Sequence, residues 1–155
     1  MRTKSLFMET TRIEPPQTVG EIQKLLGQYG ASAIRTDYDN GEVVSVSFTL
    51  KIDEGDPIGF RLPCRWGAIK TIFDSRRKRG RDRGRGRPPK DFTAQAKRIA
   101  WRQILRWVEA QLALTQTNMA KLHEVFMPYL LMDKGQTIFE KMESHNWRFQ
   151  LEHKK

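Results

Sequence analysis

The residues best suited to a chemical role lie together in the middle of the chain. Between Arg76 and Lys90, nine of fifteen side chains are basic and only Asp82 is acidic, which gives this segment a formal net charge of +8. The whole chain of 155 residues has a net charge of +10, so the remainder carries only +2. Closely spaced arginine and lysine side chains neutralise phosphates. The sequence therefore predicts a segment that contacts nucleic acid, carried by an otherwise near-neutral protein.

The composition of this region also predicts its backbone conformation. Residues 75–90 contain no apolar side chain apart from two prolines, and they are rich in Gly and Arg. Such a stretch has nothing to bury, and its like charges repel one another. We expect a long basic loop that is solvated or extended and connects two helices.

Part of this loop resembles a known DNA-binding motif. The stretch Arg83–Lys90 reads RGRGRPPK and resembles an AT-hook with basic flanks. Gly86 has no side chain to hold the backbone away from the floor of a narrow minor groove, and Pro88 favours an extended backbone. A·T tracts narrow this groove and make it strongly negative, which attracts arginine. The resemblance implies that Arg85 and Arg87 lie along the groove, with basic neighbours on flanking phosphates.

The predicted partner is therefore duplex DNA, favoured over RNA. Arg-Gly stretches also bind RNA or occur as linkers, and the basic run at residues 76–79 would serve as a nuclear import signal in a eukaryote. The predicted DNA contacts are Arg76, Arg77, Lys78, Arg79, Arg81, Arg83, Arg85, Gly86, Arg87, Pro88 and Lys90.

The chain before the loop, residues 1–74, predicts a mixed α+β part. A short strand is expected at Leu6–Ile13, and a capping box from Thr18 to Glu21 predicts the start of a helix. Apolar and polar residues then alternate around an Asp-Asn-Gly turn, which is typical of a β-hairpin with one buried face. A third strand and a short helix follow. This order of helix, three strands and helix resembles that of the double-stranded-RNA-binding domain in topology only. That family has a basic cluster at the start of the second helix, whereas residues 64–68 here contain one Arg.

The chain after the loop, residues 91–155, is predicted to be helical with a short C-terminal strand beginning at Trp147. A long helix from Asp91 to about Leu114 carries Arg98, Arg102 and Arg106 at successive i+4 positions. These arginines are either a solvated face or secondary phosphate contacts. The capping box from Thr137 to Glu140 predicts another helix. We expect both parts to form one compact unit.

The predicted fold class is thus α+β, with an antiparallel sheet of three or four strands, about five helices and a helical C-terminal half. Outside the basic loop, the chain loosely resembles short, uncharacterised proteins encoded by bacteriophages and prophages. The likeness is carried by the helix at residues 100–114 and by residues 124–129.

The residues do not predict an enzyme. There is no phosphate-binding loop, dinucleotide fingerprint or nucleophile motif, and neither a metal site nor a cofactor is expected. The acids Asp53, Glu54 and Asp56 leave a small metal-dependent nuclease as an alternative. The single cysteine, Cys64, fits either a reducing compartment or simply a small, packed and inert side chain.

The absence of a long apolar run predicts no membrane association. We therefore expect a cytoplasmic protein of a bacterium or phage-infected cell, or a nuclear one in a eukaryote. The predicted function is that of a non-enzymatic nucleic-acid-binding accessory protein, with an RNA-binding module as a further alternative. No protein partner is predicted.

Overall fold

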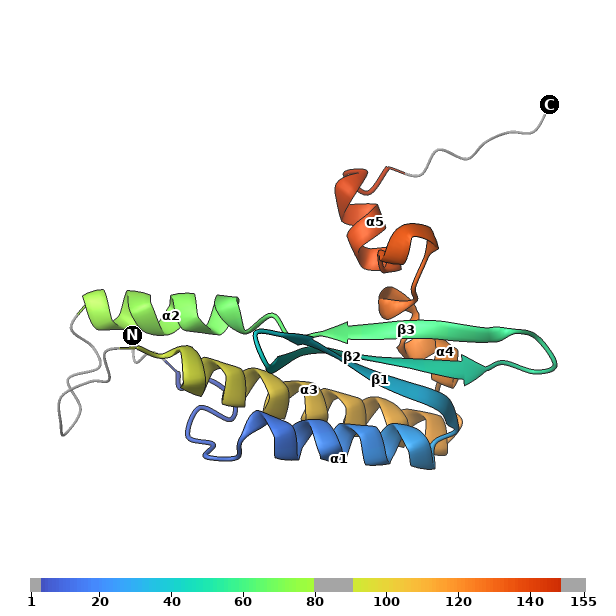
Figure 1. Cartoon of the computed structure of the whole chain (residues 1–155), viewed down its shortest axis with the longest axis horizontal. Coiled ribbons are helices and arrows are strands. Elements are labelled where there is room, and N and C mark those ends of the chain that lie inside the picture. Colours follow the sequence, from blue (N-terminus) through green and yellow to red (C-terminus); the bar gives the residue numbers. More distant parts are fainter. Residues whose placement is uncertain (1–3, 80–90, 149–155) are drawn as a thin grey trace.

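The computed structural model describes residues 4–79 and 91–148, and the described part is an α+β fold (Figure 1). This confirms the predicted fold class, with three strands in the sheet. The elements in chain order are α1 (Pro15–Gln28), β1 (Ala31–Asp39), β2 (Glu42–Lys51), β3 (Pro57–Pro63), α2 (Trp66–Lys78), α3 (Thr93–Gln116), α4 (Leu122–Val125), the 3-10 helices η1 (Met127–Tyr129) and η2 (Asp133–Gly135), and α5 (Ile138–Ser144).

The three strands form an antiparallel sheet in the order β1-β2-β3. Asn40 and Gly41 connect β1 to β2 with φ values of 49° and 79°, as expected for a two-residue hairpin turn. The register pairs Ile34 with Phe48 and Phe48 with Phe60, so one apolar face runs across all three strands. The alternation in the sequence predicted this face correctly.

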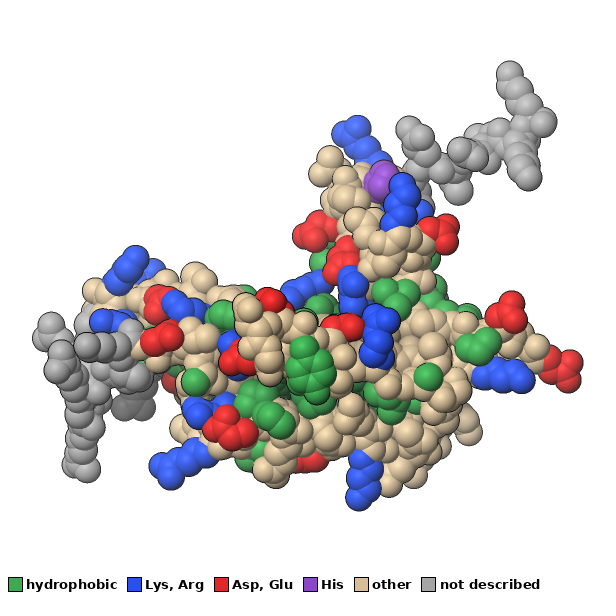
Figure 2. All heavy atoms as spheres, in the orientation of Figure 1, with side chains coloured by type: hydrophobic (Ala, Val, Ile, Leu, Met, Phe, Trp, Pro, Cys, Tyr) green, Lys and Arg blue, Asp and Glu red, His purple; other side chains and the backbone are tan. Residues whose placement is uncertain are grey.

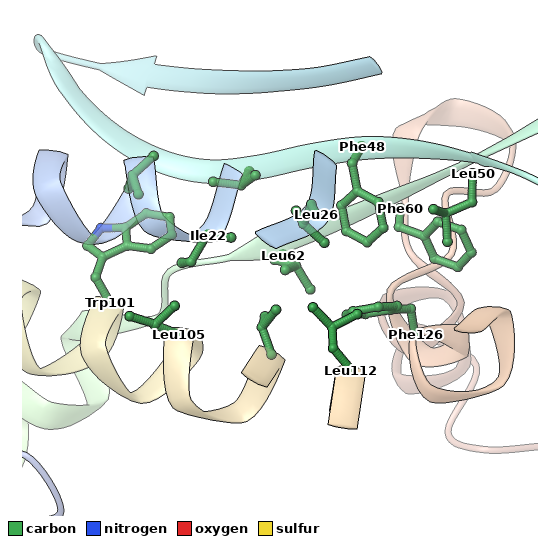
Figure 3. Close-up of a cluster of buried hydrophobic side chains, with 13 residues drawn as sticks. Ile22, Leu26, Phe48, Leu50, Phe60, Leu62, Trp101, Leu105, Leu112 and Phe126 are labelled. Atoms are coloured by element: carbon green, nitrogen blue, oxygen red, sulfur yellow. The ribbon is translucent and has the colours of Figure 1, made fainter. Parts of the chain in front are cut away.

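α1 and α3 lie against that apolar face and enclose the main core with it (Figure 3). Each element contributes residues at the spacing of its own secondary structure, with period two in the strands and about 3.6 in the helices. The buried core residues shown include Ile22 and Leu26 from α1, Phe48, Leu50, Phe60 and Leu62 from the sheet, and Trp101, Leu105 and Leu112 from α3.

The opposite face of the sheet is polar. Asp37 accepts a hydrogen bond of 2.7 Å from the Ser45 hydroxyl and one of 3.4 Å from Ser47. Arg35 forms an ion pair of 3.0 Å with the same carboxylate. The Ser45 hydrogen bond and the charge of Arg35 lower the pKa of Asp37 below its ordinary value. Asp37 is therefore a carboxylate at neutral pH, and its negative charge lies on the polar face of the sheet.

The N-terminal predictions were wrong in two respects. Residues 7–10 form turns where a strand was expected, and α1 begins at Pro15, three residues before the predicted cap Thr18. Proline is well suited to the first helical turn, because the amide hydrogens it lacks would have no partner there. Thr18 consequently lies inside the helix and is fully buried, where its hydroxyl accepts a weak hydrogen bond from Arg102.

At the C-terminal end, the predicted capping box is confirmed. The Glu140 amide donates to Thr137 Oγ1 at 3.2 Å, and the Thr137 amide donates to Glu140 Oε2 at 2.9 Å. The expected strand does not begin at Trp147, which lies in a turn with φ of 59° and packs against Phe139. The remainder of that predicted strand, residues 149–151, lies outside the described residues.

The short elements α4 and η1 close one end of the core through Phe126. Its fully buried ring lies 5.1 Å from Phe48, 6.2 Å from Phe60 and 5.6 Å from Trp107, measured between ring centroids. Trp107 is therefore partly buried and packs against the main core.

Replacing Phe126 with Ala should lower the free energy of unfolding by about 3–5 kcal/mol, because the cavity would remove contacts with three aromatic rings. Met127→Ala is the matched control, since this neighbouring side chain is half exposed, and should change stability by less than about 0.5 kcal/mol. Urea denaturation followed by circular dichroism measures both. Equal effects of the two substitutions would contradict this role for Phe126.

Candidate nucleic-acid interface

The basic segment begins inside a helix. α2 extends to Lys78, so Arg76, Arg77 and Lys78 occupy its last turn and Arg79 caps it. The prediction of a loop from residue 75 was therefore wrong by about one helical turn. Cationic side chains near a helix C-terminus interact favourably with its partial negative charge. This position supplies a structural reason for part of the basic run.

The two ends of the segment lie at the same end of the molecule (Figure 1). α2 packs along the first half of α3, and Phe73 stacks on Phe92 with ring centroids 5.2 Å apart. These two rings and Ile99 form a second buried cluster. The structure thereby fixes both flanks of the basic segment on one pair of packed helices.

The start of α3 is held by Asp91. Its carboxylate accepts hydrogen bonds from the amide and hydroxyl of Thr93 at 3.0 and 2.7 Å, and the Thr93 hydrogen bonds lower the pKa of Asp91. The predicted DNA contacts between these flanks are outside the described residues: Arg81, Arg83, Arg85, Gly86, Arg87, Pro88 and Lys90.

Arg76 is a structural residue in this arrangement. Its guanidinium donates to Glu9 at 2.8 Å and to the Lys4 carbonyl at 3.2 Å, and it lies over the Phe73 ring. Its side chain is only 13% exposed. Arg76 therefore attaches the N-terminal turns to α2, and it has little surface to offer a phosphate.

The next three basic residues have a different environment. Arg77, Lys78 and Arg79 are exposed at the end of α2. Figure 2 shows lysine and arginine side chains gathered at this end of the molecule. Of the predicted contacts within the described residues, these three are the ones accessible to a polyanion.

The three arginines of α3 are engaged by carboxylates of the protein. Arg98 pairs with Glu14 at 2.7 Å, Arg102 with Glu21 at 3.1 Å, and Arg106 with Glu109 at 2.7 Å. The Arg102 side chain is 5% exposed, so it is a buried residue between α1 and α3 rather than a phosphate contact. Its environment also includes Thr18.

The sequence carries a signal for two of these pairs that the spacing of the arginines within α3 does not show. Glu14 is the N-cap residue of α1, and Glu21 follows it by seven residues, about two helical turns, so both lie near the same side of α1. That side packs on α3, where it meets Arg98 and Arg102. No comparable signal relates Arg76 to Glu9, because these residues are far apart in sequence and Glu9 lies in a turn.

The acids considered for a nuclease are not assembled into a site. Asp53, Glu54 and Asp56 are exposed in the connection between β2 and β3, at the opposite end of the sheet from the β1–β2 turn. Within residues 4–79 and 91–148, no group of three or more His, Cys, Asp or Glu side chains could hold a metal ion.

Cys64 also has the environment of a structural residue. Burial raises the pKa of its thiol to about 12, and it packs against the main core. A thiol with this pKa is protonated at neutral pH and is a poor nucleophile.

Comparisons with protein-family models, curated proteins and solved structures found no match to this chain. No helix of the described residues has the length and apolar character needed to cross a membrane.

Replacing Arg102 with Ala should lower the free energy of unfolding by about 2–3 kcal/mol, because it removes a buried guanidinium and leaves Glu21 without its partner. Arg106→Ala removes the same charge from an exposed pair and should change stability by less than about 1 kcal/mol. Thermal denaturation measures both variants. Similar losses of stability would show that burial does not distinguish the two arginines.

Proposed function

We propose that this chain is a non-enzymatic accessory protein that binds duplex DNA through residues 77–90. The observation that carries the proposal is the distribution of charge. Residues 77–90 hold eight basic side chains against the single acid Asp82. In contrast, the arginines of α3 are paired with the carboxylates of Glu14, Glu21 and Glu109. The highest density of positive charge in the chain thus lies in this one segment.

The packing of α2 on α3 supports this proposal. The helices that flank the segment, α2 and α3, are held in place because Phe73 stacks on Phe92 and Arg76 pairs with Glu9. A binding segment attached to rigid helices loses less conformational freedom on binding than one attached at a single end. Lys78 and Arg79 are exposed at the end of α2 and add two basic side chains next to residues 80–90.

The sequence of the segment supports a preference for A·T-rich DNA. Arg85, Gly86, Arg87 and Pro88 form the core that resembles an AT-hook. We propose that Arg85 and Arg87 enter the minor groove, while Arg83 and Lys90 contact phosphates on either side. The resemblance to phage-encoded proteins adds the proposal that the chain acts in the cytoplasm of a bacterial or phage-infected cell.

Replacing residues 80–90 with a Gly/Ser linker of equal length should abolish specific binding to an A·T-rich duplex, because it removes five of the eight basic residues of 77–90 and leaves α2 intact. For the unaltered chain, up to eight phosphate contacts predict a slope of about −5 to −7 in a plot of log K against log salt. Fluorescence anisotropy at several salt concentrations measures both quantities. An unchanged affinity of the linker variant would exclude the segment as the DNA contact.

The minor-groove contact needs a control of equal charge. The double variant Arg85→Ala/Arg87→Ala should bind A·T-rich and G·C-rich duplexes about equally, because it loses the groove contacts. Arg79→Ala/Arg81→Ala removes the same charge and should weaken binding to both duplexes while keeping the A·T preference. Identical behaviour of the two double variants would overturn the groove contact. Tighter binding to structured RNA than to either duplex would favour the RNA-binding alternative.

A further inference from the structure

β1 is an edge strand whose outer side has no strand partner among the described residues. The sheet order is β1-β2-β3, and within residues 4–79 and 91–148 no backbone hydrogen bond outside the sheet involves residues 31–39. The other edge differs, because the Leu131 amide donates to the Gly59 carbonyl at 2.8 Å and so covers part of β3. A free edge of nine residues offers a row of backbone donors and acceptors to another strand.

The side chains of this edge are complementary to a second copy of themselves. Arg35 and Asp37 lie on the polar face of β1, two residues apart, and form an ion pair of 3.0 Å within the chain. If two β1 strands pair antiparallel with Thr36 opposite Thr36 of the second copy, Arg35 lies opposite Asp37 of that copy. The two-fold axis generates this contact twice, so the pair of strands contains two Arg35–Asp37 contacts between the copies. Opposite charges in directly facing positions stabilise a strand pair.

Neighbouring registers have less charge complementarity than the one centred on Thr36. A shift of one residue would place the polar face of one strand beside the apolar face of the other. A shift that places Arg35 opposite Arg35 brings two like charges together, and Asp37 then faces Ala33 of the second copy. A shift that places Asp37 opposite Asp37 brings two carboxylates together, although Arg35 then faces Asp39 of the second copy. Of these pairings, the one centred on Thr36 is thus the one in which both Arg35 and Asp37 face an opposite charge.

The apolar face of β1 supports the same register. Tyr38 is 64% exposed at the end of this face, although it is a large aromatic side chain. In the pairing centred on Thr36, Tyr38 lies opposite Ile34 of the second copy, and aromatic and β-branched residues are favourable cross-strand pairs. Below Thr36 and Tyr38, a cavity of about 340 Å³ reaches Trp101 between α1 and α3. The second copy would lie at the rim of this cavity.

We propose that two copies of this chain form a symmetric dimer by antiparallel pairing of their β1 strands, centred on Thr36. This inference is independent of DNA binding, because it uses residues far from 77–90 in the sequence. The partner proposed for the β1 edge is a second copy of the chain.

Charge reversal tests the register directly. Arg35→Asp and Asp37→Arg should each raise the dissociation constant of the dimer by about tenfold or more, since each brings two like-charge pairs together. The double variant Arg35→Asp/Asp37→Arg should restore dimerisation, because opposite charges then face each other again. Sedimentation equilibrium of the full chain from about 1 to 200 μM measures the constants. Circular dichroism melting of each variant confirms that it is folded.

A cross-link gives a second readout that does not depend on charge. In a Cys64→Ser background, Thr36→Cys should form an intermolecular disulfide on mild oxidation, because the two side chains meet at the two-fold axis. Ala33→Cys is the matched control, because its two copies would be about 20 Å apart. A monomeric unaltered chain throughout the concentration range would overturn the proposal. So would a dimer that both single reversals leave unchanged, or equal cross-linking at positions 33 and 36.

Discussion

The buried stripe of α3 is the feature on which the rest of the structure depends. Ile99 packs with Phe73 and Phe92 in the cluster below α2, while Trp101, Leu105 and Leu112 pack with α1 and the sheet in the main core. One helix of 24 residues thus connects both hydrophobic clusters. The position of α2 relative to the sheet follows from this connection. The basic segment is attached to the protein at the point where α2 and α3 meet.

The strands of the sheet could be predicted more accurately from the sequence than the boundaries of the helices. The alternation from Val44 to Ile52 has a period that only a strand with one buried face satisfies, and the Asn40-Gly41 turn fixes where it reverses. A capping box is a weaker signal. The motif at Thr137 begins α5, but the one at Thr18 lies inside α1, because Pro15 and Pro16 can occupy the first helical turn. Local sequence alone does not distinguish these cases.

The candidate interface was predictable only as a concentration of charge. Arg76 belongs to the basic run by composition, yet its pairing with Glu9 makes it part of the folded protein. Arg102 similarly belongs to the arginine stripe of α3 but is buried against Glu21. Such assignments depend on carboxylates that are remote in sequence and become neighbours only in the fold. A run of like charges therefore overstates the surface available to a partner.

The two proposals together have a consequence for affinity that neither has alone. A dimer paired through β1 would carry two basic segments in a fixed two-fold relation. If both segments reach one duplex, the second binding step becomes intramolecular, and its effective concentration is set by the geometry of the dimer. The segment would then need only modest affinity for each site. Because the charges of Arg35 and Asp37 determine the strand register in this arrangement, they would also determine the spacing between the two DNA contacts.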